Sequence, residues 1–354
     1  MSPDAEVISR SQRQLQSRIE ALRQSAPYRT YERVRDWVMT IKDLEAARRE
    51  ATHAPSQYWR EELSGFEYLL DASPFVIEKL RHHTHHVTGL RPYEYRSNYH
   101  RAQARFRDKF AALITEAGGK GLFVPEAEAL GGFGHDIDGE RVNLDTLKFF
   151  EVMIVLERGA VLQEFRDNPE RRLVWEIGAG WGGFPYVFKT LCRNVTYVIT
   201  DLPELFLFSG TYLASLFPDA RFRFFGEVPA DRLFDRWEEY DFIFVPDTFH
   251  ESVRPERVDL TINMVSFQEM TNAQVTAYVR RASQLGSPFL YSLNRDRSSY
   301  NRELTSVWNI IEQSYWPHDY RVLPVGYTKM LDEVPTSPER DYKHTIGWRR
   351  IASP

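Results

Sequence analysis

Apolar residues recur at helical spacing through most of the first 115 residues. The recurrences are Leu15, Ile19 and Leu22; Val34, Trp37, Val38 and Ile41; and Phe66, Leu69 and Leu70. Apolar positions three or four residues apart are typical of amphipathic helices. The pattern therefore predicts a helical N-terminal region over residues 8–115.

Residues 117–140 have neither a helical nor a strand period. The segment concentrates glycine and contains Pro125, so it is predicted to be a long structured loop. Long loops inside compact proteins are often functional. A helix is expected directly after it, with Asn143 as its N-cap and a break by Pro169.

From about residue 171 short apolar runs alternate with helical segments. The runs are 173–177, 196–200, 222–225, 241–245, 259–265, 288–293, 320–327 and 343–351. This alternation is typical of an α/β fold with a parallel sheet and crossover helices. Eight runs exceed the seven strands of one common architecture, so either 222–225 or 241–245 is expected to be an edge or accessory strand.

A chain of 354 residues exceeds what one hydrophobic core usually organises. We therefore expect residues 1–149 to form a helical cap region and residues 150–354 to form the sheet domain. A C2 homodimer is the commonest assembly for such a protein and is kept as a possibility.

Composition excludes several classes of protein. With 42% hydrophobic, 27% charged and 14% aromatic residues, the chain is neither disordered nor fibrous. A net charge of −5 gives no basis for nucleic-acid binding through bulk charge. Because Cys192 is the only cysteine and no stretch approaches a membrane span, we expect a cytoplasmic protein without a membrane partner.

The strongest chemical signal is VWEIGAGWGGF at 174–184, where a buried strand runs into a glycine-rich turn and then a helix. Glycines let a ligand approach the main chain, and the following helix offers free N–H donors. Asp201 ends the next strand, 23 residues after Gly178. A carboxylate there can accept both hydroxyls of an adenosine ribose.

Gly178, Gly180 and Gly183 also satisfy the dinucleotide pattern GxGxxG, so a nicotinamide or flavin enzyme is one alternative. Glu176 favours S-adenosylmethionine instead, because a carboxylate on the strand tip suits a cofactor with an ammonium and a sulfonium group and no pyrophosphate. For the adenine contact we consider Glu227 and Asp247 and favour the latter. The predicted cofactor-binding residues are Glu176, Gly178, Ala179, Gly180, Gly182, Asp201, Leu202, Asp247, Asn263 and Ser266.

The glycine loop, its continuation YVITDLPELFLFSGTYLASLFP and the segment DLTINMVSFQEM together resemble the bacterial sugar O-methyltransferase family. The resemblance extends weakly upstream to 80–89 and 131–150 and covers most of residues 65–350. It implies a class I S-adenosylmethionine-dependent methyltransferase sheet, mostly parallel with an antiparallel C-terminal strand. It also implies a hydroxyl of a sugar or a glycosylated natural product as the acceptor.

Methyl transfer to a hydroxyl requires a base near the cofactor. Many small-molecule O-methyltransferases of this superfamily carry a histidine where this chain has Gln268. The candidate bases are therefore Glu269, then His250 beside Glu251, and then His135 in the glycine-rich loop. For each of them a hydrogen-bonded structural role is at least as common.

Further polar residues are candidates for binding the acceptor. They are Gln268, Glu251, Asn294 and Arg295; the arginine lies in a basic stretch that could hold a phosphate or carboxylate. The histidines of residues 82–86 lack a third ligand and are interpreted as a helix C-terminus closed by Gly89. Asp136, Asp138 and Asp247 could hold a divalent ion, but no metal site is indicated.

Three alternatives remain open from the sequence. A methyltransferase acting on an amine, a carbon or a phenol would share nearly all of these residues. An NAD(P)-dependent oxidoreductase would use the same glycine loop. A non-catalytic protein would retain a vestigial nucleotide fold.

Overall fold

The computed structural model describes residues 3–48, 55–96, 98, 100–166, 168–314, 321–322 and 342–348. Its centre is an eight-stranded sheet in the order β5-β6-β4-β3-β7-β8-β10-β9. The strands are β3 (Arg172–Ile177), β4 (Val195–Asp201), β5 (Phe222–Phe224), β6 (Phe242–Pro246), β7 (Leu260–Met264), β8 (Phe289–Asn294), β9 (Arg321–Val322) and β10 (Lys343–Trp348). Strands β3 to β8 pair in parallel, and β10 runs antiparallel to both β8 and β9.

This architecture confirms the α/β, mostly parallel sheet with an antiparallel C-terminal strand and a helical N-terminal region. The run at 222–225 is the edge strand β5, as one of the two alternatives expected. Of the run at 320–327 only β9 lies in the described part of the chain. Residues 349–351 of the last run also lie outside the described residues.

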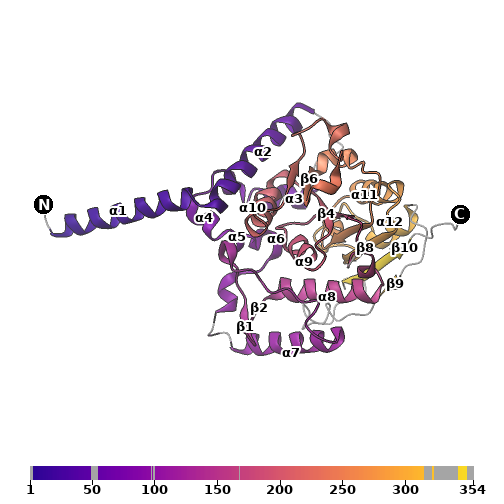
Figure 1. The fold of residues 1–354 in the computed structure, drawn as a ribbon, viewed down its shortest axis with the longest axis horizontal. Helices are drawn as coiled ribbons and strands as arrows, with labels where there is room; N and C mark the ends of the chain where they lie inside the picture. The colour runs from indigo at the N-terminus through magenta and orange to yellow at the C-terminus, as the bar shows by residue number, and fades with distance from the viewer. Residues whose placement is uncertain are drawn as a thin grey trace.

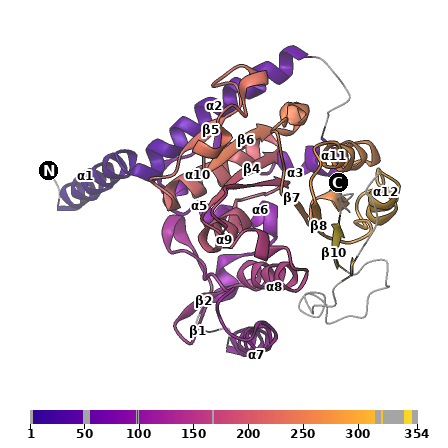
Figure 2. The same cartoon turned by 45° about the vertical axis from the view of Figure 1, so that its right-hand side comes forward.

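Helices cover both faces of the sheet (Figures 1 and 2). The sheet helices are α8 (Leu144–Arg158), α9 (Gly183–Leu191), α10 (Phe206–Leu216), α11 (Asn272–Gln284) and α12 (Val307–Gln313). Along β3 the side chains alternate: Trp175 packs in one core with α11 and α12, while Val174 packs in the other with α8, α9 and α10. The strand's period of two thus separates the two layers.

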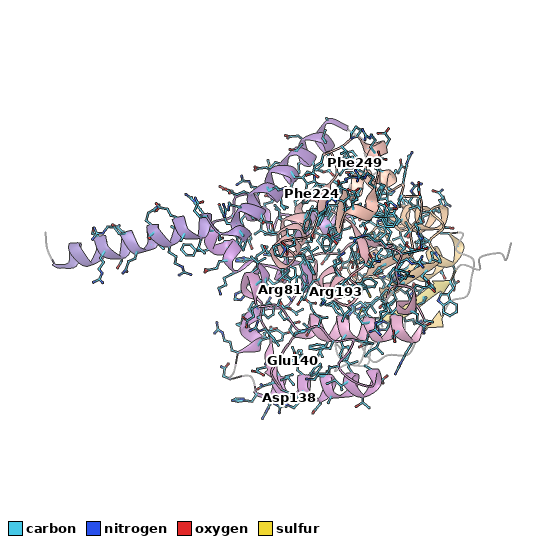
Figure 3. All side chains as sticks on the ribbon, viewed as in Figure 1. Arg81, Asp138, Glu140, Arg193, Phe224 and Phe249 are labelled. Atoms are coloured by element: carbon cyan, nitrogen blue, oxygen red, sulfur yellow. The ribbon has the colours of Figure 1, made fainter. Side chains whose placement is uncertain are left out.

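The N-terminal region wraps around the sheet and does not form a separate core. Its helices are α1 (Pro3–Arg23), α2 (Ala26–Arg48), α3 (Gln57–Leu63), α4 (Pro74–Glu78), α5 (Leu80–His83), α6 (His85–Thr88) and α7 (His100–Ala117). Helix α1 projects away from the body, and α2 lies along α10 (Figure 1). Trp37 of α2 packs on Phe224, which Figure 3 labels, and donates a 2.7 Å hydrogen bond to the carbonyl of Phe225.

The expected boundary between residues 149 and 150 lies within α8. Helix α8 runs continuously through that point, and Phe149 and Phe150 belong to the same buried core as Leu80 and Phe184. None of the described helices has both the length and the apolar character needed to cross a membrane.

The segment 117–140 is not entirely a loop. Residues His135–Ile137 form β1 and Glu140–Val142 form β2, joined by the two-residue turn Asp138-Gly139. Both turn residues have positive φ, 54° and 79°, as a type I′ hairpin requires. The expected loop was wrong here because strands of three residues are too short to show a period.

The predicted helix start at Asn143 is confirmed by a capping box. The Asn143 side chain accepts from the backbone N–H of Thr146, and the Thr146 hydroxyl accepts from the backbone N–H of Asn143. The asparagine amide also donates to Glu126 at 2.8 Å. Helix α8 is therefore anchored at its first turn to the segment that precedes the hairpin.

A fully buried arginine joins the N-terminal region to the sheet. Arg81 of α5, labelled in Figure 3, donates to Glu126 at 2.7 Å and to Asp145 of α8 at 2.9 Å. Its guanidinium lies 3.7 Å from the ring centroid of Trp181 in the glycine loop. One side chain thus connects α5, the segment that contains Glu126, α8 and the loop after β3.

Replacing Arg81 should strongly destabilise the protein. The substitution Arg81→Ala leaves the buried Glu126 without its cation and Asp145 with Lys148 alone, and we expect a loss of about 3–5 kcal/mol of unfolding free energy. Urea denaturation measures it. Arg18→Ala removes an exposed pair with Glu78 and should cost less than about 1 kcal/mol. Equal losses in the two variants would contradict the role given to Arg81.

Candidate functional site

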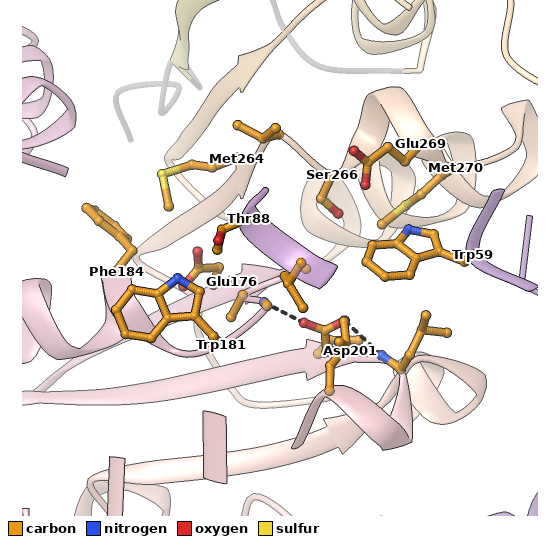
Figure 4. Close-up of a pocket in the computed structure, with 18 of the residues that line it drawn as sticks. Trp59, Thr88, Glu176, Trp181, Phe184, Asp201, Met264, Ser266, Glu269 and Met270 are labelled. Atoms are coloured by element: carbon orange, nitrogen blue, oxygen red, sulfur yellow. Dashed lines mark hydrogen bonds between the residues drawn. The ribbon is translucent and has the colours of Figure 1, made fainter. Parts of the chain in front are cut away.

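The loops at the carboxyl ends of β3, β4, β6 and β7 enclose a cavity (Figure 4). Open α/β sheets bind their ligands at this edge. The N-terminal region closes the cavity with Pro55, Ser56, Trp59, Val87, Thr88 and Leu90. Nine of the predicted site residues line it: Glu176, Gly178, Ala179, Gly180, Asp201, Leu202, Asp247, Ser266 and Glu269.

The glycine loop needs its first glycine for close approach to a neighbouring loop. Gly178 has φ of 75°, and a Cβ there would lie 2.0 Å from the Ser266 hydroxyl oxygen. Only a residue without a side chain lets the two loops meet. Gly182 has a different role. It is the N-cap of α9 and packs against Ser209 of α10, away from the cavity.

Asp201 holds the glycine loop in place. Its two carboxylate oxygens accept from the backbone N–H groups of Gly180 at 2.7 Å and Leu202 at 2.9 Å, drawn as dashed lines in Figure 4. Burial nevertheless raises the pKa of this carboxyl to about 7. Each oxygen keeps a second lone pair, so the group can still accept hydroxyl donors from a ligand.

Glu176 presents a carboxyl group that is only half satisfied. Its Oε2 accepts a 2.7 Å hydrogen bond from Tyr197, whereas its buried Oε1 has no partner among the described residues. The side chain is 1% exposed. Burial, with Asp201 nearby, raises its pKa to about 8. A cationic donor from a ligand would both satisfy Oε1 and favour the charged form.

Asp247 follows β6 and also has an unpartnered oxygen, the buried Oδ1. Burial and the neighbouring Glu45 raise its pKa well above the usual value. The other candidate for this position, Glu227, does not line the cavity; it accepts from the Phe224 N–H and pairs with Arg33. The structure therefore places Asp247, the favoured alternative, at the site.

The loop after β7 is supported from behind by amide side chains. Asn263 donates to the carbonyl of Ile177 at 2.8 Å and accepts from the amide of Asn294 at 2.8 Å. Asn294 in turn accepts from the backbone N–H of Ser266. Val265, which precedes Ser266 in this loop, has φ of 55°, an outlier for a β-branched residue.

Four of the predicted binding residues thus lie behind or beside the cavity lining. Asn263 and Asn294 are the supporting amides, and Gln268 accepts from the backbone N–H of Arg295 at 2.9 Å. The Arg295 guanidinium lies 4.6 Å from the ring centroid of Tyr342, which does line the cavity. Asn263, Asn294 and Gln268 support this loop from behind and do not line the cavity.

Glu269 is the one predicted base that lines the cavity. Its pKa is raised to about 8, mainly by burial and further by Glu62 and Asp201, while Arg295 acts in the opposite direction. Its backbone carbonyl accepts a 2.7 Å hydrogen bond from Ser56, which joins it to the N-terminal region. A carboxylate so placed can take a proton from a ligand hydroxyl.

The structure does not bring the histidine candidates into this cavity. His250 is buried, lies 2.9 Å from the carbonyl of Asp247 and packs on Tyr278, while its sequence neighbour Glu251 is exposed. The short 3₁₀ turn sends the two side chains into different environments. His135 lines a second cavity instead.

The histidine tract ends a helix as expected, because Gly89 is the left-handed C-cap of α6. The tract is not one helix, since Thr84 separates α5 from α6. His83 bonds to the Tyr68 hydroxyl at 2.7 Å. Across the described ranges no three His, Cys, Asp or Glu side chains are grouped to hold a metal ion.

Lys148 is a site residue that the sequence analysis missed. It lies on α8, lines the cavity and pairs with Asp145 at 2.9 Å. Among the described lining residues it is the one cation, against the carboxyls of Asp145, Glu176, Asp201, Asp247 and Glu269. No local motif marks it, because it precedes the glycine loop by 30 residues and reaches the site only through the packing of α8.

No family model matches the chain, and no curated protein matches it. Among solved structures, an O-methyltransferase family protein of Burkholderia thailandensis is 14% identical, with a TM-score of 0.34; the match covers 58% of this chain and 60% of that one. The chain therefore spans about three fifths of the length of that protein.

Two further solved structures are similar at the same level. Human N-acetylserotonin methyltransferase, solved in complex with S-adenosylmethionine, is 11% identical over 68% of this chain and 66% of its own, with a TM-score of 0.33. A pyocyanin biosynthetic protein is 11% identical over 57% and 58%, with a TM-score of 0.32. Because these values are low, the fold rests on the strand order described above.

The raised pKa of Glu176 predicts a pH dependence of stability. Its pKa is about 8 in the folded chain against an ordinary 4.5, so the folded form binds the proton more tightly. The unfolding free energy of the ligand-free protein should therefore fall as pH rises from 4.5 to about 8, and this group contributes up to about 1.4 kcal/mol per pH unit. In Glu176→Gln that part of the slope should disappear.

Urea denaturation between pH 5.5 and 8.5 measures both slopes. Glu116→Gln, at an exposed position, is the matched control and should keep the wild-type slope. A slope unchanged in Glu176→Gln would show that Glu176 is ionised in the folded protein throughout this range.

Proposed function

We propose that the protein is an S-adenosylmethionine-dependent O-methyltransferase. The observation that carries the proposal is the set of ionisable groups around the cavity. Five carboxyl groups and one ammonium group line it, where a strand, a glycine loop and a helix meet. S-adenosylmethionine brings two cationic groups and one carboxylate, so its charges complement this lining. A dinucleotide would bring a pyrophosphate dianion against the same carboxyls, which disfavours the nicotinamide alternative.

Each part of the cofactor has a suitable partner. The unpartnered oxygen of Glu176 suits the ammonium, and Lys148 suits the carboxylate of the amino-acid part. Asp201 suits the ribose hydroxyls, and the unpartnered oxygen of Asp247 suits the adenine amino group. Gly178 and Gly180 let the ligand reach the main chain. The residues present therefore fit the cofactor.

When bound, S-adenosylmethionine supplies a methyl carbon that is open to in-line displacement at the sulfonium. An acceptor oxygen held in line would take this methyl group, with the sulfur leaving as the thioether of S-adenosylhomocysteine. Glu269 takes the hydroxyl proton, and the high proton affinity that burial gives its carboxylate favours this transfer. A sulfonium in the same cavity would help to keep Glu269 ionised before transfer.

The acceptor that we propose is a hydroxyl of a sugar or of a glycosylated natural product. The support is the resemblance of the glycine loop and the DLTINMVSFQEM segment to sugar O-methyltransferases. The N-terminal region acts as the cap, since it contributes Trp59, Thr88 and Leu90 to the cavity. The single cysteine, the buried Cys192, supports a cytoplasmic location.

Calorimetric titration with S-adenosylhomocysteine and, separately, with NADH tests the cofactor. We expect micromolar binding of S-adenosylhomocysteine and none of NADH. In Asp201→Asn the affinity should fall at least tenfold, about 1.4 kcal/mol, because one oxygen acceptor for the ribose is lost. Binding of NADH alone would contradict the methyltransferase proposal, and binding of neither would favour a non-catalytic protein.

Lys148→Met should separate the amino-acid part of the cofactor from the nucleoside part. Binding of S-adenosylhomocysteine should weaken about tenfold, whereas 5′-methylthioadenosine, which lacks the amino-acid part, should bind as to wild type. Lys120→Met, at an exposed pair with Glu140, is the control and should change neither. Equal weakening of both ligands would show that Lys148 acts on the whole cavity and not on the carboxylate.

A screen with labelled S-adenosylmethionine tests the acceptor class. Nucleotide sugars, glycosides, phenols and amines are offered, and transfer to the first two groups is expected. With the acceptor found, Glu269→Gln should lower kcat at least 100-fold while the affinity for S-adenosylhomocysteine is retained. Transfer to amines or phenols alone would overturn the sugar assignment and leave the cofactor assignment standing.

A further inference from the structure

A second cavity lies beside the first, between the end of α6 and helix α7. Its aromatic residues are Tyr95, Phe106 and His135, and the others include Ala102, Arg105 and Lys109. Three residues, Thr88, Leu90 and Leu144, line both cavities. The two spaces are therefore neighbours across this three-residue wall. Leu144 belongs to the same first turn of α8 as Asp145 and precedes Lys148 by one turn.

The aromatic residues form one continuous surface. The Tyr95 and His135 ring centroids are 5.0 Å apart, those of Phe106 and His135 are 5.2 Å apart, and those of Tyr95 and Phe106 are 5.6 Å apart. The Tyr95 hydroxyl accepts from the backbone N–H of Leu144 at 3.3 Å, which fixes the surface to the start of α8. Such a surface suits the apolar face of a ring.

His135 adds an unsatisfied polar group. The residue is 3% exposed, and its Nε2 has no hydrogen-bond partner among the described residues. A buried polar atom without a partner is unfavourable, so a ligand that supplies a hydrogen bond to it is favoured. Burial lowers the pKa of the imidazole, which is therefore neutral at pH 7 and suits a hydroxyl better than a carboxylate.

The two cavities differ in the ionisable side chains that line them. Arg105 and Lys109 line the second, with Glu94 as its one described acidic residue, whereas carboxyl groups dominate the first. The carboxyl groups of the first cavity can ionise beside a cationic ligand, and the second cavity offers such a ligand only Glu94. Neutral or anionic compounds have the opposite preference.

We propose that the second cavity is the acceptor subsite and that it takes a hydroxylated ring, with the ring against Tyr95 and Phe106 and one hydroxyl on His135. A second hydroxyl of the same compound then reaches the first cavity past Leu144. This inference rests on the proposed function. It makes His135 a binding residue, and proton removal stays with Glu269.

Nuclear magnetic resonance of the full chain labelled with 15N-histidine tests the subsite. The protein is saturated with S-adenosylhomocysteine and titrated with phenol in one arm and methyl β-glucoside in the other. The ring signals of His135, assigned by their loss in His135→Gln, should shift saturably with at least one compound. The arm that binds more tightly shows whether a phenolic or a sugar ring is preferred.

Filling the cavity should abolish the shift. Ala102→Trp places a large side chain in the second cavity, and Ala112→Trp makes the same change at an exposed position of α7 as the matched control. Only the first should lose the His135 response, and both should bind S-adenosylhomocysteine as wild type does. Phe106→Ala serves if Ala102→Trp does not fold, and it should weaken binding at least fivefold.

The outcomes separate this inference from the proposed function. Absence of any His135 shift, or a shift that persists in Ala102→Trp, overturns the subsite even if S-adenosylhomocysteine binds. Failure of S-adenosylhomocysteine to bind overturns the proposed function, and the titrations are then run on the ligand-free protein. A shift under those conditions identifies a ring-binding cavity but overturns its role as an acceptor subsite.

Discussion

The buried guanidinium of Arg81 is the constraint on which the geometry of the site depends. It pairs with Glu126 in the segment before the β1–β2 hairpin and with Asp145 in the first turn of α8. It also stacks on Trp181 in the glycine loop. Burying three charges is favourable only with near-ideal geometry. The N-terminal region and the carboxyl edge of the sheet therefore have little freedom to move independently.

In the cavity, by contrast, buried carboxyl groups lie together without enough cations to pair them. Glu176, Asp201, Asp247 and Glu269 are held close together by the strand tips, and burial keeps their proton affinity high. Without a ligand such a site is electrostatically unfavourable in its ionised form. A cationic ligand would act as a counterion as well as a reactant, so binding and protonation are linked.

Much of the fold follows from local sequence patterns. The strand runs, the Asn143 cap and the spacing from Gly178 to Asp201 depend on short-range rules, and the structure has all three. The hairpin at 135–142 was missed, although Asp138-Gly139 is a strong turn signal, because its strands are too short to show a period. A shared core across residue 149 could not be seen from composition.

The sequence could not predict which polar residues face the cavity, and the reason is physical. Whether a polar residue beyond a strand tip faces the ligand space depends on the backbone of one or two loop residues. Val265 with its positive φ turns Ser266 and Glu269 inward, whereas Asn263 and Gln268 bond to the main chain behind them. Lys148 arrives from a distant helix, and only tertiary packing reveals it.

The paired amides of Asn263 and Asn294 have a consequence for how the site meets its ligand. They hold Val265 in a conformation that an isolated chain would rarely visit, so the entropy of ordering this loop is lost during folding and not during binding. A rigid wall of this kind recognises shape with little adjustment. The tips of β7 and β8 consequently behave as one mechanical unit, because the two amides join both strand ends to the loop between Asn263 and Gln268.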